Sequence, residues 1–187
     1  MNTTPANALY SSDRQYTQHL TLADVDSYQQ FIVTNKDRFA PFEPLRAESY
    51  YFLEEAKKRV QQVEKGFDNR TSVSIAMFDR KHLQMIGLMN FTNIVTGCFQ
   101  ACYLGFSIDG EFEGRGYMKE ALKHTLPYIQ SEFGIHRVMA NHLPHNQRSA
   151  RLLNKLGFEE EGFAKSYLKI NGTWQDHVLT SYVFEEL

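Results

Sequence analysis

A loop with two glycines, placed between an expected strand and an expected helix, constrains the fold of this chain more than any other feature. The loop reads Glu113-Gly114-Arg115-Gly116, after an alternating stretch (Ala101 to Ile108) and before a helical pattern that starts at Met118. A strand that ends where a helix starts brings unpaired amides and the positive end of the helix dipole together. Glycines there let an anion approach the backbone closely, and Arg115 could add charge. The sequence predicts a phosphate-binding loop; the alternative is a turn whose glycines merely adopt positive φ.

The spacing of these glycines excludes two other phosphate sites. The loop is G-x-G, without the third glycine of G-x-G-x-x-G and without the GK[ST] that ends a P-loop. A dinucleotide-binding fold and a P-loop NTPase are therefore ruled out on pattern.

Strands and helices alternate along the rest of the chain and predict one mixed α/β domain over residues 1–187, with residues 1–10 as a flexible end. Period-two alternation predicts the strands, and apolar residues at helical spacing predict the helices. The expected strands cover residues 14–19, 71–79, 83–91, 101–108, 136–143, 163–170 and 176–184, and the expected helices cover about 21–32, 49–65, 118–133 and 146–157. Asn171-Gly172 predicts a hairpin turn between the last two strands.

Single residues predict further details. Two prolines in residues 38–46 favour an ordered loop, and Pro127 should kink the helix that contains it. Gly66 and Gly157 are expected at helix C-termini.

Composition excludes several classes of function. The net charge is -2 and the pI is near 6.4, so direct nucleic-acid binding is not expected. No apolar run reaches the roughly 20 residues needed to cross a bilayer, and residues 1–10 do not resemble a signal peptide, which predicts a cytoplasmic protein without membrane contact. Cys98 and Cys102 are predicted to be reduced structural thiols, and no metal site is expected.

A second motif follows the glycine loop after about thirty residues. Asn146 to Phe158 read NQRSARLLNKLGF, after the expected strand 136–143. With Glu111 to Gly116, this order of motifs resembles the GNAT acetyltransferase superfamily, and the likeness extends over essentially the whole chain. Within it the chain is most similar to the RimJ/RimL type, the ribosomal-protein N-acetyltransferases. The resemblance implies the GNAT fold: a mixed, mainly antiparallel central sheet with helices on both faces, here with a C-terminal β-hairpin.

The resemblance also implies acetyl-coenzyme A as cosubstrate, without a metal. Carried onto this chain, the diphosphate would lie on the amides of Phe112 to Tyr117. Leu104 would present its amide to the thioester carbonyl as oxyanion donor, and Phe106 would present backbone to the pantetheine arm. The implied cofactor-binding residues are Leu104, Phe106, Phe112, Glu113, Gly114, Arg115, Gly116, Tyr117, Met118, Asn146 and Ser149. Glu111 stands where relatives commonly carry glutamine or arginine, so its backbone rather than its carboxylate is expected to serve.

Three residues are candidates for the chemistry at the amine. The glutamate and tyrosine that related N-terminal acetyltransferases often use correspond here to Asn141 and Leu153, which cannot take those roles. Asn141 could instead hold a water that relays the proton, and Ser149 is the hydroxyl best placed to protonate the departing thiolate. Glu43, in the proline-flanked loop, could recognise or deprotonate a cationic N-terminus.

Each candidate has a simpler interpretation beside the chemical one. Asn146 and Ser149 could be a helix N-cap, and Glu43 a solvated loop carboxylate. His145 is a minor acid/base alternative. Arg148, Arg151 and Lys155 could reach the 3′-phosphate of the cofactor or form a solvated helix face.

The sequence thus predicts an acetyl-coenzyme A-dependent protein N-terminal acetyltransferase that works by direct transfer, as a monomer or a dimer. The resemblance implies the N-terminal alanine of a ribosomal protein as acceptor. The alternatives are an acetyltransferase for a small amine, such as a polyamine, aminoglycoside or amino acid, and a catalytically weak ribosome- or protein-binding module.

Overall fold

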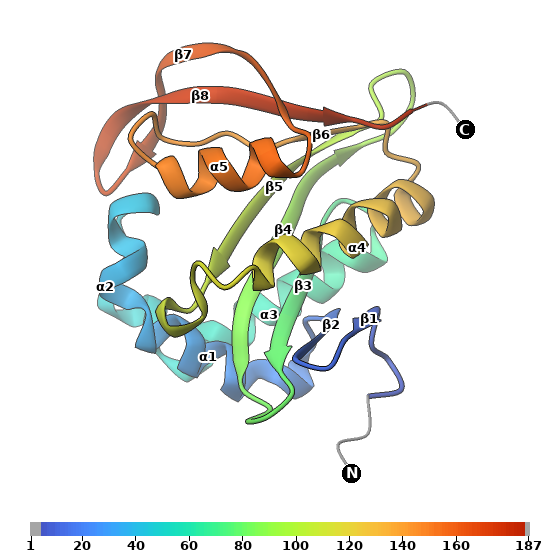
Figure 1. Ribbon diagram of the computed structural model, residues 1–187. Helices are drawn as coiled ribbons and strands as arrows, with labels where there is room; N and C mark the ends of the chain where they lie inside the picture. The colour runs from blue at the N-terminus through green and yellow to red at the C-terminus, as the bar shows by residue number, and fades with distance from the viewer. Residues whose placement is uncertain (1–4, 186–187) are drawn as a thin grey trace.

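The computed structural model describes residues 5–185 and contains one eight-stranded sheet (Figure 1). The strand order is β1-β2-β3-β4-β5-β6-β8-β7, and every neighbouring pair is antiparallel except β5 and β6. The strands are β1 (Tyr10–Ser11), β2 (Gln15–His19), β3 (Val73–Asp79), β4 (Met85–Val95), β5 (Ala101–Ile108), β6 (Arg137–Met139), β7 (Glu159–Ile170) and β8 (Thr173–Val183). The expected mixed, mainly antiparallel sheet is confirmed.

Helices cover both faces of this sheet, as expected. The α-helices are α1 (Val25–Thr34), α2 (Lys36–Phe39), α3 (Leu53–Asp68), α4 (Tyr117–Phe133) and α5 (Gln147–Lys155). Short 3-10 turns lie at Leu22–Asp24, Ala40–Phe42, Glu48–Tyr51 and Gly110–Phe112. Helices α4 and α5 enclose one buried apolar cluster with the sheet, and α1 and α3 enclose a second cluster on the opposite face (Figure 1). Burial of these two apolar layers drives the fold.

Turns predicted from single residues are present in the structure where one residue type is needed for the backbone geometry. Asn171 and Gly172 both have positive φ (44° and 80°), which is the geometry of a type I′ hairpin turn between β7 and β8. Gly157 has φ 91° just after α5. Thr21 and Asp24 form a capping box at the start of the Leu22–Asp24 turn. Helix α4 continues through Pro127 as one element.

Several expectations need correction. Residues 1–4 of the end that was expected to be flexible lie outside the described residues, and in the rest of it Leu9 donates to the Thr17 carbonyl and Tyr10 belongs to β1. Gly66 lies inside α3 rather than at its end, and a Cβ at this position would lie 2.1 Å from the Ser72 Oγ. The absence of a side chain at Gly66 therefore lets α3 approach Ser72 closely.

Two element boundaries also differ from the expectation. The segment 38–46 begins as helix, because Pro41 occupies the first turn of the 3-10 segment Ala40–Phe42, where a missing amide costs nothing. The strand expected over 136–143 is regular only at Arg137–Met139. Beyond it the Asn141 side chain, rather than a backbone carbonyl, accepts from the Thr180 amide at 3.3 Å.

The parallel pair β5 and β6 opens the sheet at its centre. Their pairing covers only Ala101 to Tyr103 against Arg137 to Met139, although β5 continues to Ile108. The second half of β5 therefore has no partner strand on that side, and the sheet offers free backbone groups at this point.

Candidate active site

A groove of about 790 Å³ lies where the glycine loop, the start of α4, the end of β5 and the start of α5 meet. The segment 37–43 closes it from the opposite side. Of the residues predicted from the sequence, the groove brings together Glu43, Phe106, Phe112, Glu113, Gly114, Gly116, Tyr117, Met118, Asn146 and Ser149. Leu104, Arg115 and Asn141 are not among the lining residues.

The glycine loop presents a row of free amides to this groove. Within residues 5–185, the backbone amides from Gly114 to Lys119 have no hydrogen-bond partner. The Phe112 and Glu113 amides, in contrast, already donate to the Asp109 and Gly110 carbonyls at 3.0 and 3.4 Å. The anion-binding donors therefore begin at Gly114 and extend into the first turn of α4, where the helix dipole adds a positive potential.

Both glycines of the loop adopt conformations that other residues avoid. Gly114 has φ 71° and Gly116, the residue that precedes α4, has φ 81°. A Cβ on Gly114 would meet no atom within 4 Å. The two interpretations of the loop are thus compatible, because the positive φ turns the chain and the missing side chain leaves open space beside the free amides.

Arginines flank the loop from two directions. The Glu113 carboxylate pairs with Arg38 at 2.6 Å and with Arg148 at 2.6 Å. Both guanidinium groups are more than a third exposed, so each pair contributes little to stability. Their value is positional, because the pairs hold two cationic side chains at the rim of the groove. Arg151 and Lys155 line the same rim.

The open edge of β5 supplies a further donor. The Gln100 carbonyl accepts from the His136 and Arg137 amides, so it points toward β6. Alternate residues of a strand direct their backbone groups to the same side, which turns the Leu104 and Phe106 amides toward β6 as well. Pairing with β6 ends at Tyr103, so the Leu104 amide faces the gap between the two strands.

Asn146 and Ser149 form the N-cap of α5. The Asn146 side chain accepts from the Ser149 amide at 3.1 Å, which is the cap expected from the sequence. The Ser149 hydroxyl makes no hydrogen bond to protein within the described residues. The cap therefore uses the backbone of Ser149 and leaves its hydroxyl available in the groove.

Asn141 belongs to a polar cluster that the sequence did not reveal. Its amide donates to the Tyr167 hydroxyl at 3.3 Å while its oxygen accepts from Thr180. A hydrogen bond to Tyr103 and burial raise the pKa of Tyr167, so its phenol stays neutral near pH 7. Asn141 thus bridges two strands, and only one of its N–H bonds remains for a water.

Glu43 lies at the mouth of the groove beside the tip of the β7–β8 hairpin. Its backbone carbonyl accepts from the Asn171 amide at 2.8 Å, and its carboxylate lies 3.6 Å from the Arg46 Nε. Leu45, two residues after Glu43, and Trp174, at the start of β8, are 73% and 60% exposed. His145 is exposed, with its ring 6.4 Å from that of Phe42.

Metal-ligating groups, membrane-spanning helices and the two cysteines were also considered in the sequence. No group of three or more metal-ligating side chains occurs in the described chain, and none of its helices is long and apolar enough to cross a membrane. Both cysteines are free thiols, and burial raises the pKa of Cys102 to about 12.

The groove thus joins three features: the open end of the parallel strand pair, free amides at the start of α4, and the unpaired Ser149 hydroxyl. Free amides at a helix N-terminus can bind an anion such as phosphate. Residues 16–159 match the family model of the acetyltransferase (GNAT) domain. The chain belongs to the GNAT acetyltransferase family, and it is an N-acetyltransferase of that family.

Within the family, the chain is similar to acetyltransferases named for ribosomal proteins. The chain is 39% identical to the [ribosomal protein uS5]-alanine N-acetyltransferase of Escherichia coli over 91% of this chain and 88% of that protein. It is also similar to the crystal structure of a ribosomal-protein-S5-alanine acetyltransferase from Vibrio fischeri, with a TM-score of 0.89, 31% identity and coverage of 93% and 95% of the two chains. The structure of Mycobacterium smegmatis RimJ in complex with a coenzyme A disulfide shares the fold, with a TM-score of 0.84, 19% identity and coverage of 90% and 81%. The chain is thus a homologue of the uS5-alanine N-acetyltransferases.

Acetyl-coenzyme A, which enzymes of this family use, fits the residues present. The free amides are hydrogen-bond donors of the kind that a diphosphate needs, and no protein side chain fills the space beside Gly114. Arg38 and Arg148 add two positive charges at the rim, where both pair with Glu113. The groove volume of about 790 Å³ falls within the range of sites that bind ligands of this size.

Proposed function

We propose that this protein transfers an acetyl group from acetyl-coenzyme A directly to the N-terminal amine of a protein, and that the acceptor is the N-terminal alanine of a ribosomal protein. The observation that carries the cosubstrate is the row of unpartnered amides from Gly114 to Lys119 at the head of α4. The acceptor rests on the likeness to relatives named for the alanine of ribosomal protein uS5.

Acetyl-coenzyme A supplies a thioester, whose carbonyl carbon is the electrophile. In our proposal the amides from Gly114 onward hold the diphosphate, and the Leu104 amide stabilises negative charge on the thioester oxygen. The amine nitrogen would bond to the carbonyl carbon as the carbon–sulfur bond breaks, and the Ser149 hydroxyl would donate a proton to the departing thiolate. The proton that leaves the amine would return to Ser149 through solvent, so that the products are the acetylated amine and the free thiol, with Ser149 unchanged.

The amine needs little help to react. An α-amino group has a pKa near 7.7 to 8.0, so roughly a tenth is uncharged at pH 7. A strong general base is therefore unnecessary, which agrees with Asn141 in place of a glutamate and with a neutral Tyr167. Positioning of the two substrates then supplies most of the rate.

Glu43 suits the recognition of a cationic N-terminus. We propose that the Glu43 carboxylate recognises the cationic amine, in competition with Arg46, before the amine loses its proton. The exposed side chains of Leu45 and Trp174 would contact the acceptor beyond its first residue.

The acceptor is tested with peptides that share one body and differ only in the first residue. The protein is mixed with acetyl-coenzyme A and peptides that begin with Ala, Ser or Met, with spermidine, with an aminoglycoside, and with the Ala peptide blocked at its amine. Free thiol release gives the rate, and mass spectrometry locates the acetyl group. We expect the fastest release with the Ala peptide and no release with its blocked form.

Two outcomes would contradict the proposal. Faster release with spermidine or the aminoglycoside than with any peptide would indicate a small-amine acetyltransferase. Coenzyme A binding without release on any amine would indicate a binding module that keeps the fold.

A further inference from the structure

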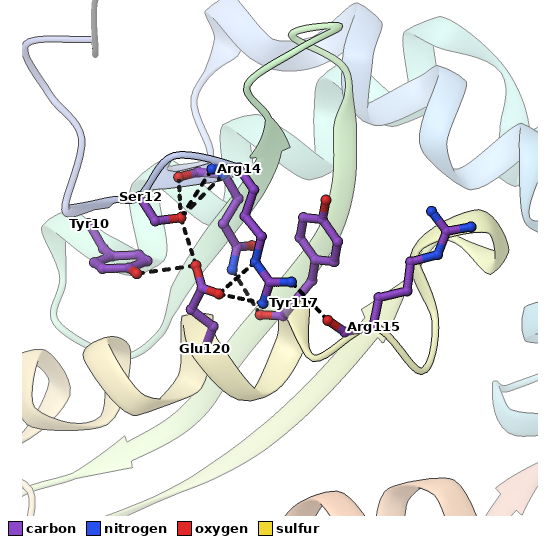
Figure 2. A network of polar contacts seen from close by, with 7 residues as sticks. Tyr10, Ser12, Arg14, Arg115, Tyr117 and Glu120 are labelled. Carbon is purple, nitrogen blue, oxygen red and sulfur yellow. Dashed lines mark hydrogen bonds and ion pairs between the residues drawn. The ribbon is translucent and has the colours of Figure 1, made fainter.

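Residues of the first hairpin, formed by β1 and β2, contact the glycine loop and the start of α4 (Figure 2). Arg14, at the turn between β1 and β2, donates from Nη1 to the Arg115 carbonyl at 2.8 Å and from Nε to the Glu120 carboxylate at 2.7 Å. Its Nη2 also pairs with Glu120, and its guanidinium lies 4.3 Å from the centre of the Tyr117 ring. One side chain thus contacts the loop, the first residue of α4 and a carboxylate in the first turn of that helix.

Neighbouring residues of the hairpin add further hydrogen bonds to the start of α4. Ser12 and Tyr10 donate to the second oxygen of Glu120 at 2.7 and 3.2 Å, and Gln15 donates to the Tyr117 carbonyl at 3.0 Å. Burial alone would raise the pKa of Glu120, but hydrogen bonds from Ser12, Arg14 and Gln15 and the charge of Arg14 lower it to about 2. Glu120 is therefore ionised near pH 7.

These contacts fix the direction of the anion-binding amides. In a planar trans peptide the carbonyl of one residue and the amide of the next point in opposite directions. Holding the Arg115 carbonyl toward Arg14 therefore turns the Gly116 amide away from Arg14, and Gly116 lines the groove. The bond from Gln15 to the Tyr117 carbonyl acts in the same way on the Met118 amide.

The loop needs such external support. Gly114 and Gly116 have positive φ, and glycine loses more backbone freedom on ordering than any other residue. Without anchors the loop would sample many conformations, and a ligand would have to bear the entropy of ordering it.

We propose that Arg14 is a positioning residue for the cosubstrate: together with the β1–β2 hairpin it pre-orders the glycine loop so that its amides meet the diphosphate. This inference rests on the proposed function of the loop. Because Glu120 neutralises Arg14, the effect is geometric rather than a matter of net charge. Lysine at position 14 keeps the charge but cannot reach the carboxylate and the carbonyl with one planar fork, so it should not restore binding.

The other end of α4 offers a matched control. Arg70 pairs with Glu132 at 3.2 Å, donates to the Glu132 carbonyl and lies 4.9 Å from the Phe133 ring centre. It makes the same three kinds of contact as Arg14, on the same helix. Arg14 contacts Tyr117, which lines the groove, whereas neither Glu132 nor Phe133 lines it. Any loss common to both arginines therefore reports the stability of α4 alone.

The test compares wild type, Arg14→Gln, Arg14→Lys and Arg70→Gln by calorimetric titration with coenzyme A, by steady-state kinetics and by thermal unfolding. We expect both Arg14 variants to weaken coenzyme A binding and raise the KM for acetyl-coenzyme A by about tenfold, with kcat at saturation within about twofold of wild type. Arg70→Gln should bind like wild type. If Arg14→Gln does not fold, Arg14→Lys decides.

Wild-type affinity in the Arg14 variants, or equal losses in Arg14→Gln and Arg70→Gln, would overturn the positioning role. Wild-type affinity for coenzyme A in Arg14→Lys alone would show that charge, rather than the planar geometry of arginine, explains the positioning role. Failure of the wild-type protein itself to bind coenzyme A would instead contradict the proposed function.

Discussion

Gly114→Ala is expected to weaken coenzyme A binding by about tenfold or more, since the added Cβ would enter the space where the diphosphate should lie. At Gly114 φ is 71° and no protein atom lies within 4 Å of that Cβ position, so the folded protein has room for the methyl group. The substitution should still cost about 1–2 kcal/mol of stability, because alanine disfavours positive φ. Calorimetric titration and thermal unfolding measure the two effects separately.

Gly97 provides the control for backbone strain. It has φ 74°, it also has no atom within 4 Å of a Cβ position, and it lies in the loop between β4 and β5, outside the groove. Gly97→Ala should lose a similar amount of stability and keep wild-type affinity for coenzyme A. Equal affinities in the two variants would show that the loop does not hold the diphosphate.

Ser149→Ala should lower kcat by about 10- to 100-fold while leaving the affinity for coenzyme A within about twofold of wild type. The reason is that its hydroxyl, in our proposal, protonates the thiolate, whereas the N-cap of α5 uses the Ser149 amide, which alanine retains. Rapid-mixing measurement of thiol release at saturating substrates gives the rate of the chemical step.

Asn146→Ala separates the effect of losing the helix cap from the effect of losing the Ser149 hydroxyl. It removes the cap itself and should cost about 1 kcal/mol of stability. Equal losses of kcat and affinity in Ser149→Ala, or an unchanged kcat, would reduce Ser149 to a residue of the cap.

Much of this site could be predicted from the sequence because its signals are local. Two glycines between a strand and a helix, an Asn146 cap and an Asn-Gly turn each act within a few residues, and the structure places them as expected. The motif order then identified the family, which the comparisons confirm.

Contacts between distant residues could not be predicted. Arg14 and Glu120 are 106 positions apart, and nothing in either neighbourhood marks them as partners. The contact of Tyr167 with Asn141 could not be predicted because β7 is irregular. Its register against β8 shifts between Ala164 and Leu168, and Ser166 has φ 47°. Such a bulge breaks the two-residue alternation from which the facing side of a strand is inferred. The amides of Phe112 and Glu113 were expected to be free, but a 3-10 turn uses them.

A crystal structure of the protein saturated with coenzyme A tests the central claim most directly. We predict the diphosphate within hydrogen-bonding distance of the amides that follow Glu113 and the sulfur in the gap between β5 and β6, near the Ser149 hydroxyl. Density for the molecule at any other surface, with the groove still open, would contradict the proposed catalytic site.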